Sequence, residues 1–279
     1  METIYGVMDT LLPLEAFHFS FMKNALLAVL LLTPLLGLLG TMAVNHQMAF
    51  FSDALGHSAI TGIGLGMLLG LRNDLVALLI FGTVWAILIC VIKQSGSASA
   101  DTIISVFSST SIAAGLLILA RGGKFAKYSS LLIGDILAVT SVDLLALAIA
   151  MPLGILLWTL MYNQLLLTSV SPSLARSRGI HIRIVECAFV VLVAFAVMLA
   201  IRWVGVLLIN ALLILPAAAG RNLAVNSRQH AVFTVLIALL SGVLGLIAAY
   251  YGDTSAGASI VLISAMFYVL SLLGRRFSK

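Results

Sequence analysis

The chain has 279 residues, of which 62% are hydrophobic and only 9% are charged. Roughly a quarter of the residues in a soluble domain are charged, so this composition excludes a soluble globular protein and indicates a polytopic membrane protein. The formal charge of +5 would suggest nucleic-acid binding in a soluble chain. In a membrane protein this charge is expected from Lys and Arg in the loops, so no nucleic-acid partner is predicted. Membrane lipid is expected to surround the chain.

Nine apolar segments approach the roughly 20 residues that a helix needs to cross a bilayer core. They predict an all-α fold in which residues 1–279 form a single transmembrane domain with about eight or nine membrane-spanning helices. The predicted spans are 23–42, 54–71, 75–92, 102–120, 143–161, 182–201, 204–220, 230–250 and 255–273. The second and seventh are the shortest, so eight spans remain an alternative.

Lys and Arg gather on one side of this arrangement. With a cytoplasmic C-terminus, the cytoplasmic set is Lys93, Arg176, Arg178, Arg183, Arg221, Arg228, Arg275, Arg276 and Lys279. The smaller outer set is Lys23, Arg72, Arg121, Lys124, Lys127 and Arg202. The positive-inside rule therefore predicts an outer N-terminus and a cytoplasmic C-terminus.

Two connections between the spans have features of their own. Residues 123–145 carry Asp135 and Asp143, and they are interpreted either as a re-entrant half-helix or as an ordinary outer loop. Residues 171–179 read SPSLARSRG, with Ser171 suited to an N-cap, Pro172 to the first helical position and Gly179 to a left-handed C-terminal stop. This pattern predicts a short helix on the cytoplasmic side.

Asp53 and His57 lie in the second predicted span, in the stretch FFSDALGHSAITGIGLG. Residues four apart lie on one face of a helix, and an ionisable residue in lipid costs at least about 2.5–3.5 kcal/mol. A carboxylate and an imidazole on one face can ligate a metal ion, and a two-fold dimer would double the pair to four ligands. A structural hydrogen bond and a proton relay are the alternatives.

Small residues follow the same span at helical spacing. Ser58, Gly62 and Gly66 form one small-xxx-small stripe, and Gly56 belongs to a second. Such stripes allow close approach of neighbouring helices, so we expect this span to be packed inside the protein.

Cys90 and Cys187 each lie in an apolar run without paired spacing, so they are expected to be small core residues rather than a disulfide or a metal site. The chain has neither a G-x-x-x-x-G-K-[ST] nor a G-x-S-x-G motif. No catalytic residue is predicted, and the chain is not expected to be an enzyme.

Five segments in order resemble the zinc/manganese/iron ABC transporter permease family. They are MAFFSDALGHSAITGIGLG, LLIGDILAVTSVDLL, SPSLARSRGI, VGVLLINALLILPAAAGR and YYGDTSAGASIVL. The resemblance runs from about residue 40 to the end of the chain, which makes it far more specific than shared hydrophobicity.

The resemblance implies a permease of the bacterial inner membrane that forms the ion pathway at a dimer interface, with a second copy or a paralogue. Cytoplasmic ATP-binding subunits would hydrolyse ATP, and an extracytoplasmic metal-binding protein would deliver zinc, manganese or iron. No cofactor would be bound permanently. By the same resemblance Asp53 and His57 touch the metal, and the short helix couples to the ATPase through Ser171, Pro172, Leu174, Ala175 and Gly179.

Two departures from the family pattern bear on these expectations. Ser173 stands where many relatives have an acidic residue after the proline, and the fourth span reads VFSSTSIAAG where zinc-type relatives often carry a histidine. The alternative function is a proton-coupled secondary transporter that uses Asp53 and His57 as a proton relay, although the chain shows no internal repeat.

Overall fold

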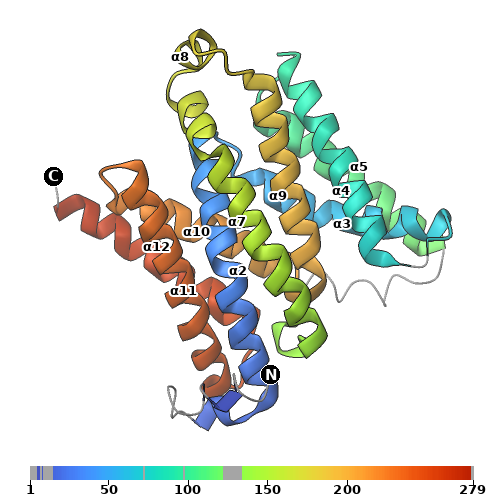
Figure 1. The fold of residues 1–279 in the computed structure, drawn as a ribbon. Coiled ribbons are helices and arrows are strands. Elements are labelled where there is room, and N and C mark those ends of the chain that lie inside the picture. Colours follow the sequence, from blue (N-terminus) through green and yellow to red (C-terminus); the bar gives the residue numbers. More distant parts are fainter. Residues whose placement is uncertain are drawn as a thin grey trace. The chain divides into compact units, whose positions relative to one another are not determined.

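The computed structural model describes residues 5, 6, 8, 15–71, 73–96, 98–121 and 134–277, and all regular structure in these ranges is helical (Figure 1). The long helices are α2 (Ser20–Asn45), α3 (Phe50–Leu68), α4 (Asp74–Gln94), α5 (Ala100–Arg121), α7 (Ser141–Val170), α9 (Ile182–Val204), α10 (Val206–Leu223), α11 (Ser227–Gly252) and α12 (Ala256–Phe277). The short ones are η1 (Glu15–His18), η2 (Ile136–Ala138) and α8 (Pro172–Ser177). Each predicted span therefore corresponds to one long helix, and the all-α prediction is confirmed.

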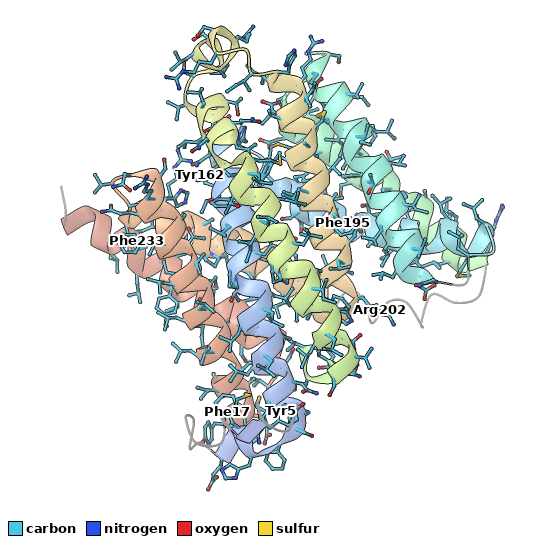
Figure 2. All side chains as sticks on the ribbon, viewed as in Figure 1. Tyr5, Phe17, Tyr162, Phe195, Arg202 and Phe233 are labelled. Carbon is cyan, nitrogen blue, oxygen red and sulfur yellow. A yellow bond between two sulfur atoms is a disulfide. The ribbon has the colours of Figure 1, made fainter. Side chains whose placement is uncertain are left out.

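Within the described ranges, eight helices are long and apolar enough to cross a membrane. Of the long helices, α3 falls outside this set because its glycines, hydroxyl residues and the Asp53–His57 pair lower its hydropathy. Large apolar side chains on the other helices point outward, as on α9, where Phe195 is 45% exposed (Figure 2). Such side chains suit a lipid environment, and the chain is a multi-pass membrane protein.

The chain folds into two compact units. Unit 1 consists of residues 1–41, 134–155 and 203–279, and unit 2 of residues 42–133 and 156–202. The boundary between the units falls within α2 and within α7, so one part of each helix belongs to unit 1 and the other part to unit 2. The prediction of a single permease domain stays a prediction.

In unit 1, α10, α11 and α12 lie side by side and pack against one another (Figure 1). Glycines permit the closest approaches: a Cβ atom added at Gly245 of α11 would lie 2.4 Å from Ile260 of α12. Gly205 separates α9 from α10 with φ of 80° and ψ of 165°, a backbone conformation that side-chain-bearing residues rarely adopt. At the start of the chain, Phe17 is fully buried, and the Tyr5 hydroxyl donates to Asn24 Oδ1 at 2.5 Å.

In unit 2, α3 packs against both α4 and α5 (Figure 1). The side chain of Asn73 caps the start of α4 by accepting from Leu75 N–H at 3.0 Å. The helices α4 and α9 are joined by a disulfide between Cys90 and Cys187. The expectation that these cysteines are separate core residues is therefore wrong, because α4 and α9 bring together two sulfur atoms that lie 97 residues apart in the sequence.

The two connections give different outcomes. The first part of the 123–145 segment, residues 123–133, lies outside the described residues. Its remainder forms η2, where Asp135 Oδ1 accepts from Leu137 N–H at 3.0 Å, and the start of α7, where Asp143 Oδ1 accepts from Trp203 Nε1–H at 2.6 Å. The predicted short helix is confirmed as α8: Ser171 accepts from Leu174 N–H, and Gly179 adopts a φ of 75°.

Candidate functional site

Asp53 and His57 are the ionisable residues of a helix whose residues are mostly buried. Most residues of α3 are buried, including the hydroxyl residues Ser52, Ser58 and Thr61. By contrast, the Asp53 side chain is 52% exposed and the His57 side chain 43% exposed. One Asp53 carboxylate oxygen, Oδ1, lies 3.5 Å from His57 Nε2. The predicted pair therefore lies on one face of α3, and that face is open.

Glycines on the opposite side of α3 explain why α4 can approach so closely. A Cβ atom at Gly66 would lie 2.4 Å from the Cβ atom of Ala77, and one at Gly62 would lie 3.0 Å from the ring of Phe81. Real Cβ atoms avoid the first of these distances, so only glycine fits at position 66 with the present packing. Gly56 is buried as well.

A second close contact, between α3 and α5, is not predicted by the sequence. A Cβ atom at Gly115 of α5 would lie 2.6 Å from the Thr61 hydroxyl oxygen, and one at Gly64 of α3 would lie 3.0 Å from Ile118. Thr61 also donates its hydroxyl to the carbonyl oxygen of Ser111. Gly64 lies between the two glycines of the predicted stripe, so the signal in the sequence is the GIGLG run as a whole.

Asp53 and His57 form an incomplete ligand set by themselves. Among the described residues, no cluster of three or more His, Cys, Asp or Glu side chains could hold a metal ion. Four ligands are usual for a closed zinc site, and manganese takes more. One copy of the chain therefore offers half of a four-ligand set, and the open face leaves room for further ligands.

His46, in the turn that precedes α3, has a structural role. Its Nε2 atom lies 3.2 Å from the carbonyl oxygen of Leu165, and its ring lies 5.9 Å from the ring of Phe189. Burial, the largest effect, lowers the pKa of His46, while nearby Glu186 opposes the shift. A neutral ring with its proton on Nε2 can donate to the carbonyl of Leu165. Through this hydrogen bond and the ring contact with Phe189, His46 links the end of α2 to α7 and α9.

Unit 2 also carries a groove of about 640 Å³ beside α8. Its lining combines α8, the linker after it, the first turns of α9 and the last residue of α4: Gln94, Pro172, Arg176, Ile180, His181, Ile182, Arg183, Ile184 and Glu186. Gln94 donates to the carbonyl oxygen of Arg183 at 3.2 Å, and Glu186 pairs with Lys93 at 3.8 Å. The two arginines leave the groove with an excess of positive charge.

Comparison with known proteins gives one consistent result. The family model described as the ABC 3 transport family matches residues 18–275. The chain is 33% identical to the high-affinity zinc uptake system membrane protein ZnuB of Haemophilus influenzae over 261 residues, covering 92% of this chain and 98% of the relative. It is 30% identical to the manganese import system permease protein ScaB of Streptococcus parasanguinis, covering 92% and 91% of the two chains.

A solved structure is similar over nearly the whole chain. It is PsaBC from Streptococcus pneumoniae in complex with a Fab, with a TM-score of 0.79 and 28% sequence identity. The match covers 97% of this chain and 95% of the other. The similarity therefore extends over both compact units.

Proposed function

Because the chain belongs to the ABC 3 transport family, we propose that it is the membrane-spanning subunit of an ATP-driven importer of a divalent metal ion, zinc or manganese. The observation that carries the proposal is the half-exposed Asp53–His57 pair on a helix whose residues are mostly buried. The names of the relatives, one a zinc uptake protein and the other a manganese import protein, support the substrate class. Imidazole and carboxylate are ligands that both ions accept.

The open face of α3 is proposed to meet a second permease chain. Two-fold symmetry would bring a second aspartate and a second histidine to the same point, giving two carboxylates and two imidazoles. An ionisable residue facing lipid is costly, and the partner would remove Asp53 and His57 from lipid. A site formed by rigid halves that rock apart also permits release, which a transport site requires.

The helix α8 is proposed to receive force from a cytoplasmic ATP-binding subunit. It is short, capped at both ends and placed between the long helices α7 and α9, so a displacement of α8 reaches both. The groove beside α8, with Arg176 and Arg183 in its lining, suits an apolar segment with acidic residues on the partner. An extracytoplasmic metal-binding protein is proposed to deliver the ion on the other side.

One expectation about α8 needs correction. Ala175 is expected to contact the partner, but its side chain is 0% exposed. Leu174, by contrast, is 45% exposed and remains available. A charged residue at position 175 would therefore disturb the fold of the loop, and Leu174 is the position that tests the contact.

Replacing Leu174 with Asp is expected to weaken capture of the ATP-binding subunit, because a charge would replace the exposed apolar side chain at the proposed contact. The measurement is co-purification of the ATP-binding subunit with the inserted permease. Val225, which is 91% exposed in the turn between α10 and α11, offers a matched control as Val225→Asp. Equal recovery with the two variants would contradict the role of α8.

The proposed function itself is tested with the complex of permease and ATP-binding subunits reconstituted in liposomes. ATP hydrolysis and uptake are measured while zinc and manganese are titrated separately, together with the metal-binding protein. We expect uptake of one or both ions to depend on ATP. Uptake that depends on a proton gradient and proceeds without ATP would overturn the proposal in favour of a secondary transporter.

A further inference from the structure

A short polar stripe runs along the first half of α5, the helix next to the Asp53–His57 pair. Its members are Asp101, Ser105 and Ser108, which follow one another at helical positions i, i+4 and i+7 and therefore share one face. Asp101 and Ser105 are exposed, and Ser108 is half-buried. We call this set the α5 stripe. The proposed function makes no use of it.

The contacts between α3 and α5 fix how the two helices are aligned. Thr61 bonds to the carbonyl oxygen of Ser111 and lies against Gly115, while Gly64 lies against Ile118. From one contact to the next, the residue numbers increase in both α3 and α5, so the two helices run parallel. Partners in these contacts differ by 50 to 54 in residue number.

If the same offset is applied to the first turns of α3 and α5, the α5 stripe lies beside Asp53 and His57. Ser105 is 52 residues from Asp53, and Ser108 is 51 residues from His57, so each hydroxyl is about level with one member of the pair. Asp101 lies about one helical turn closer to the start of α5.

The α5 stripe and the pair also lie on the same side of the two helices, the side away from α4. On α5, the residues that face α4 are Phe107, Thr110 and Ala114, which line a cavity of about 250 Å³ with Phe81 and Trp85. At 3.6 residues per turn the centre of the α5 stripe lies roughly 150° around the helix from them.

On α3, the residues that face α4 are Gly62 and Gly66. The midpoint of Asp53 and His57 lies roughly 180° around the helix from these glycines. Both polar sets therefore point away from α4, and they border the same open side of the α3–α5 pair.

The polar character of this face of α5 ends at the level of the pair. One turn beyond Ser108, the same face continues with the apolar residue Ile112, followed by the buried Leu119. The α5 stripe therefore extends from Asp53 and His57 in one direction only, toward the start of α5. This asymmetry fits a role on one side of the metal site rather than along the whole membrane.

The hydroxyls of the α5 stripe are free to bind. Serine and threonine in helices commonly donate to a carbonyl of the preceding turn, as Thr41, Ser58 and Thr83 do here. In the part of the chain that the structure describes, Ser105 and Ser108 make no such hydrogen bond. Their oxygens are available to a hydrated cation on that side.

The end of the α5 stripe at Asp101 lies on the predicted cytoplasmic side. Lys93 near the end of α4 contacts Met48, just before α3, at 3.6 Å between Nζ and Sδ. The short connection after α4 leads from there to α5, so Asp101 in the first turn of α5 lies at the same end. The positive-inside rule places Lys93 in the cytoplasm.

We propose that the α5 stripe lines the path by which the cation leaves the Asp53–His57 site for the cytoplasm. The inference rests on the proposed function, since it needs a cation at that site. Neutral hydroxyl oxygens bind a divalent ion or its water shell weakly, which permits movement, and the carboxylate of Asp101 attracts the ion at the exit. Before the ion enters this path, the imidazole of His57 and the carboxylate of Asp53 bind it more tightly.

The test compares Ser108→Val with Thr110→Val in the reconstituted complex. Both residues carry a hydroxyl on α5, but Thr110 lies on the side of the helix that faces α4. Ser108→Val is expected to lower metal uptake and metal-stimulated ATP hydrolysis roughly tenfold, the factor for losing one hydrogen-bond-strength contact to a charge, while Thr110→Val stays within about twofold. Equal uptake by the two variants, with an active wild type, would overturn the path and leave the proposed function intact. Absence of metal uptake in the wild type would overturn the proposed function instead.

Thiol labelling provides a readout that does not depend on transport. The two native cysteines form a disulfide, so they leave no free thiol. We expect a charged, water-soluble thiol reagent to modify Ser108→Cys and Ser105→Cys in the assembled complex, and manganese or zinc to slow that modification. Thr110→Cys, on the side of α5 that faces α4, should react more slowly. Equal labelling at positions 108 and 110, or no protection by either metal, would contradict a water-filled path along the α5 stripe.

Discussion

Replacing Asp53 or His57 with Ala is expected to abolish metal uptake by the assembled importer, while the permease still inserts and binds its partners. Each side chain provides half of the ligand set of one chain, and two-fold symmetry removes it from both halves at once. A loss of at least about 100-fold is expected, because removing even an outer-shell partner of a metal ligand costs roughly 10–100-fold. Uptake of radioactive zinc or manganese into proteoliposomes measures the effect.

The control is Leu65→Ala, which changes an exposed residue on the same helix without touching the pair. Each variant also has to retain the ATP-binding subunit in purification, which separates a lost ligand from a lost fold. A structural role for the pair makes a different prediction, namely that removal of a charge from lipid is tolerated. Normal uptake by Asp53→Ala or His57→Ala would therefore end the ligand proposal.

A protonophore distinguishes the ligand proposal from the proton relay. In a relay, His57 accepts and releases protons in each cycle, so uptake depends on the proton gradient and tolerates the absence of ATP. In the proposed importer, uptake depends on ATP and persists when the gradient collapses. The two mechanisms thus give opposite results for the same pair of residues.

The sequence predicted the helices well because both lipid and helix ends impose local rules. Long apolar runs of nearly fixed length predicted the nine long helices to within about four residues, except that α7 continues nine residues beyond its predicted end. The Ser171-Pro172 start and Gly179 stop predicted α8. The family predicted from five ordered segments is confirmed by the family model. These features depend mainly on residues that are neighbours in the sequence.

What the sequence did not predict depends on which helices meet. The Cys90–Cys187 disulfide requires α4 and α9 to be neighbours, and the burial of Ala175 depends on which residues cover α8. Likewise, the position of the α5 stripe beside Asp53 follows from the contact of α5 with α3. Spacing within one helix carries no information about the partner helix.

Even a single methyl group at Gly66 is expected to destabilise the packing of α3 against α4. The added Cβ atom of Gly66→Ala would lie 2.4 Å from the Cβ atom of Ala77, and that atom is fixed to the backbone of α4. Overpacking of this kind costs about 1–3 kcal/mol, and Gly66→Leu should cost more. We expect a lower midpoint of thermal unfolding in detergent and a smaller yield of assembled protein, both of which fluorescence-detected size-exclusion chromatography can measure.

The close contact at Gly66 also identifies the atom whose removal should restore the packing. Because the nearest atom to the added methyl is the Cβ of Ala77, Ala77→Gly removes it, and the double variant Gly66→Ala/Ala77→Gly should recover most of the lost stability. Gly257→Ala is the matched control, since its Cβ would meet nothing closer than 4.0 Å and the change should be neutral. If Gly66→Ala behaves like Gly257→Ala, α3 and α4 are not packed through this glycine. If Gly66→Ala is harmful but Ala77→Gly gives no rescue, the strain lies elsewhere along α3, and the open face that carries Asp53 and His57 would have to be reassigned.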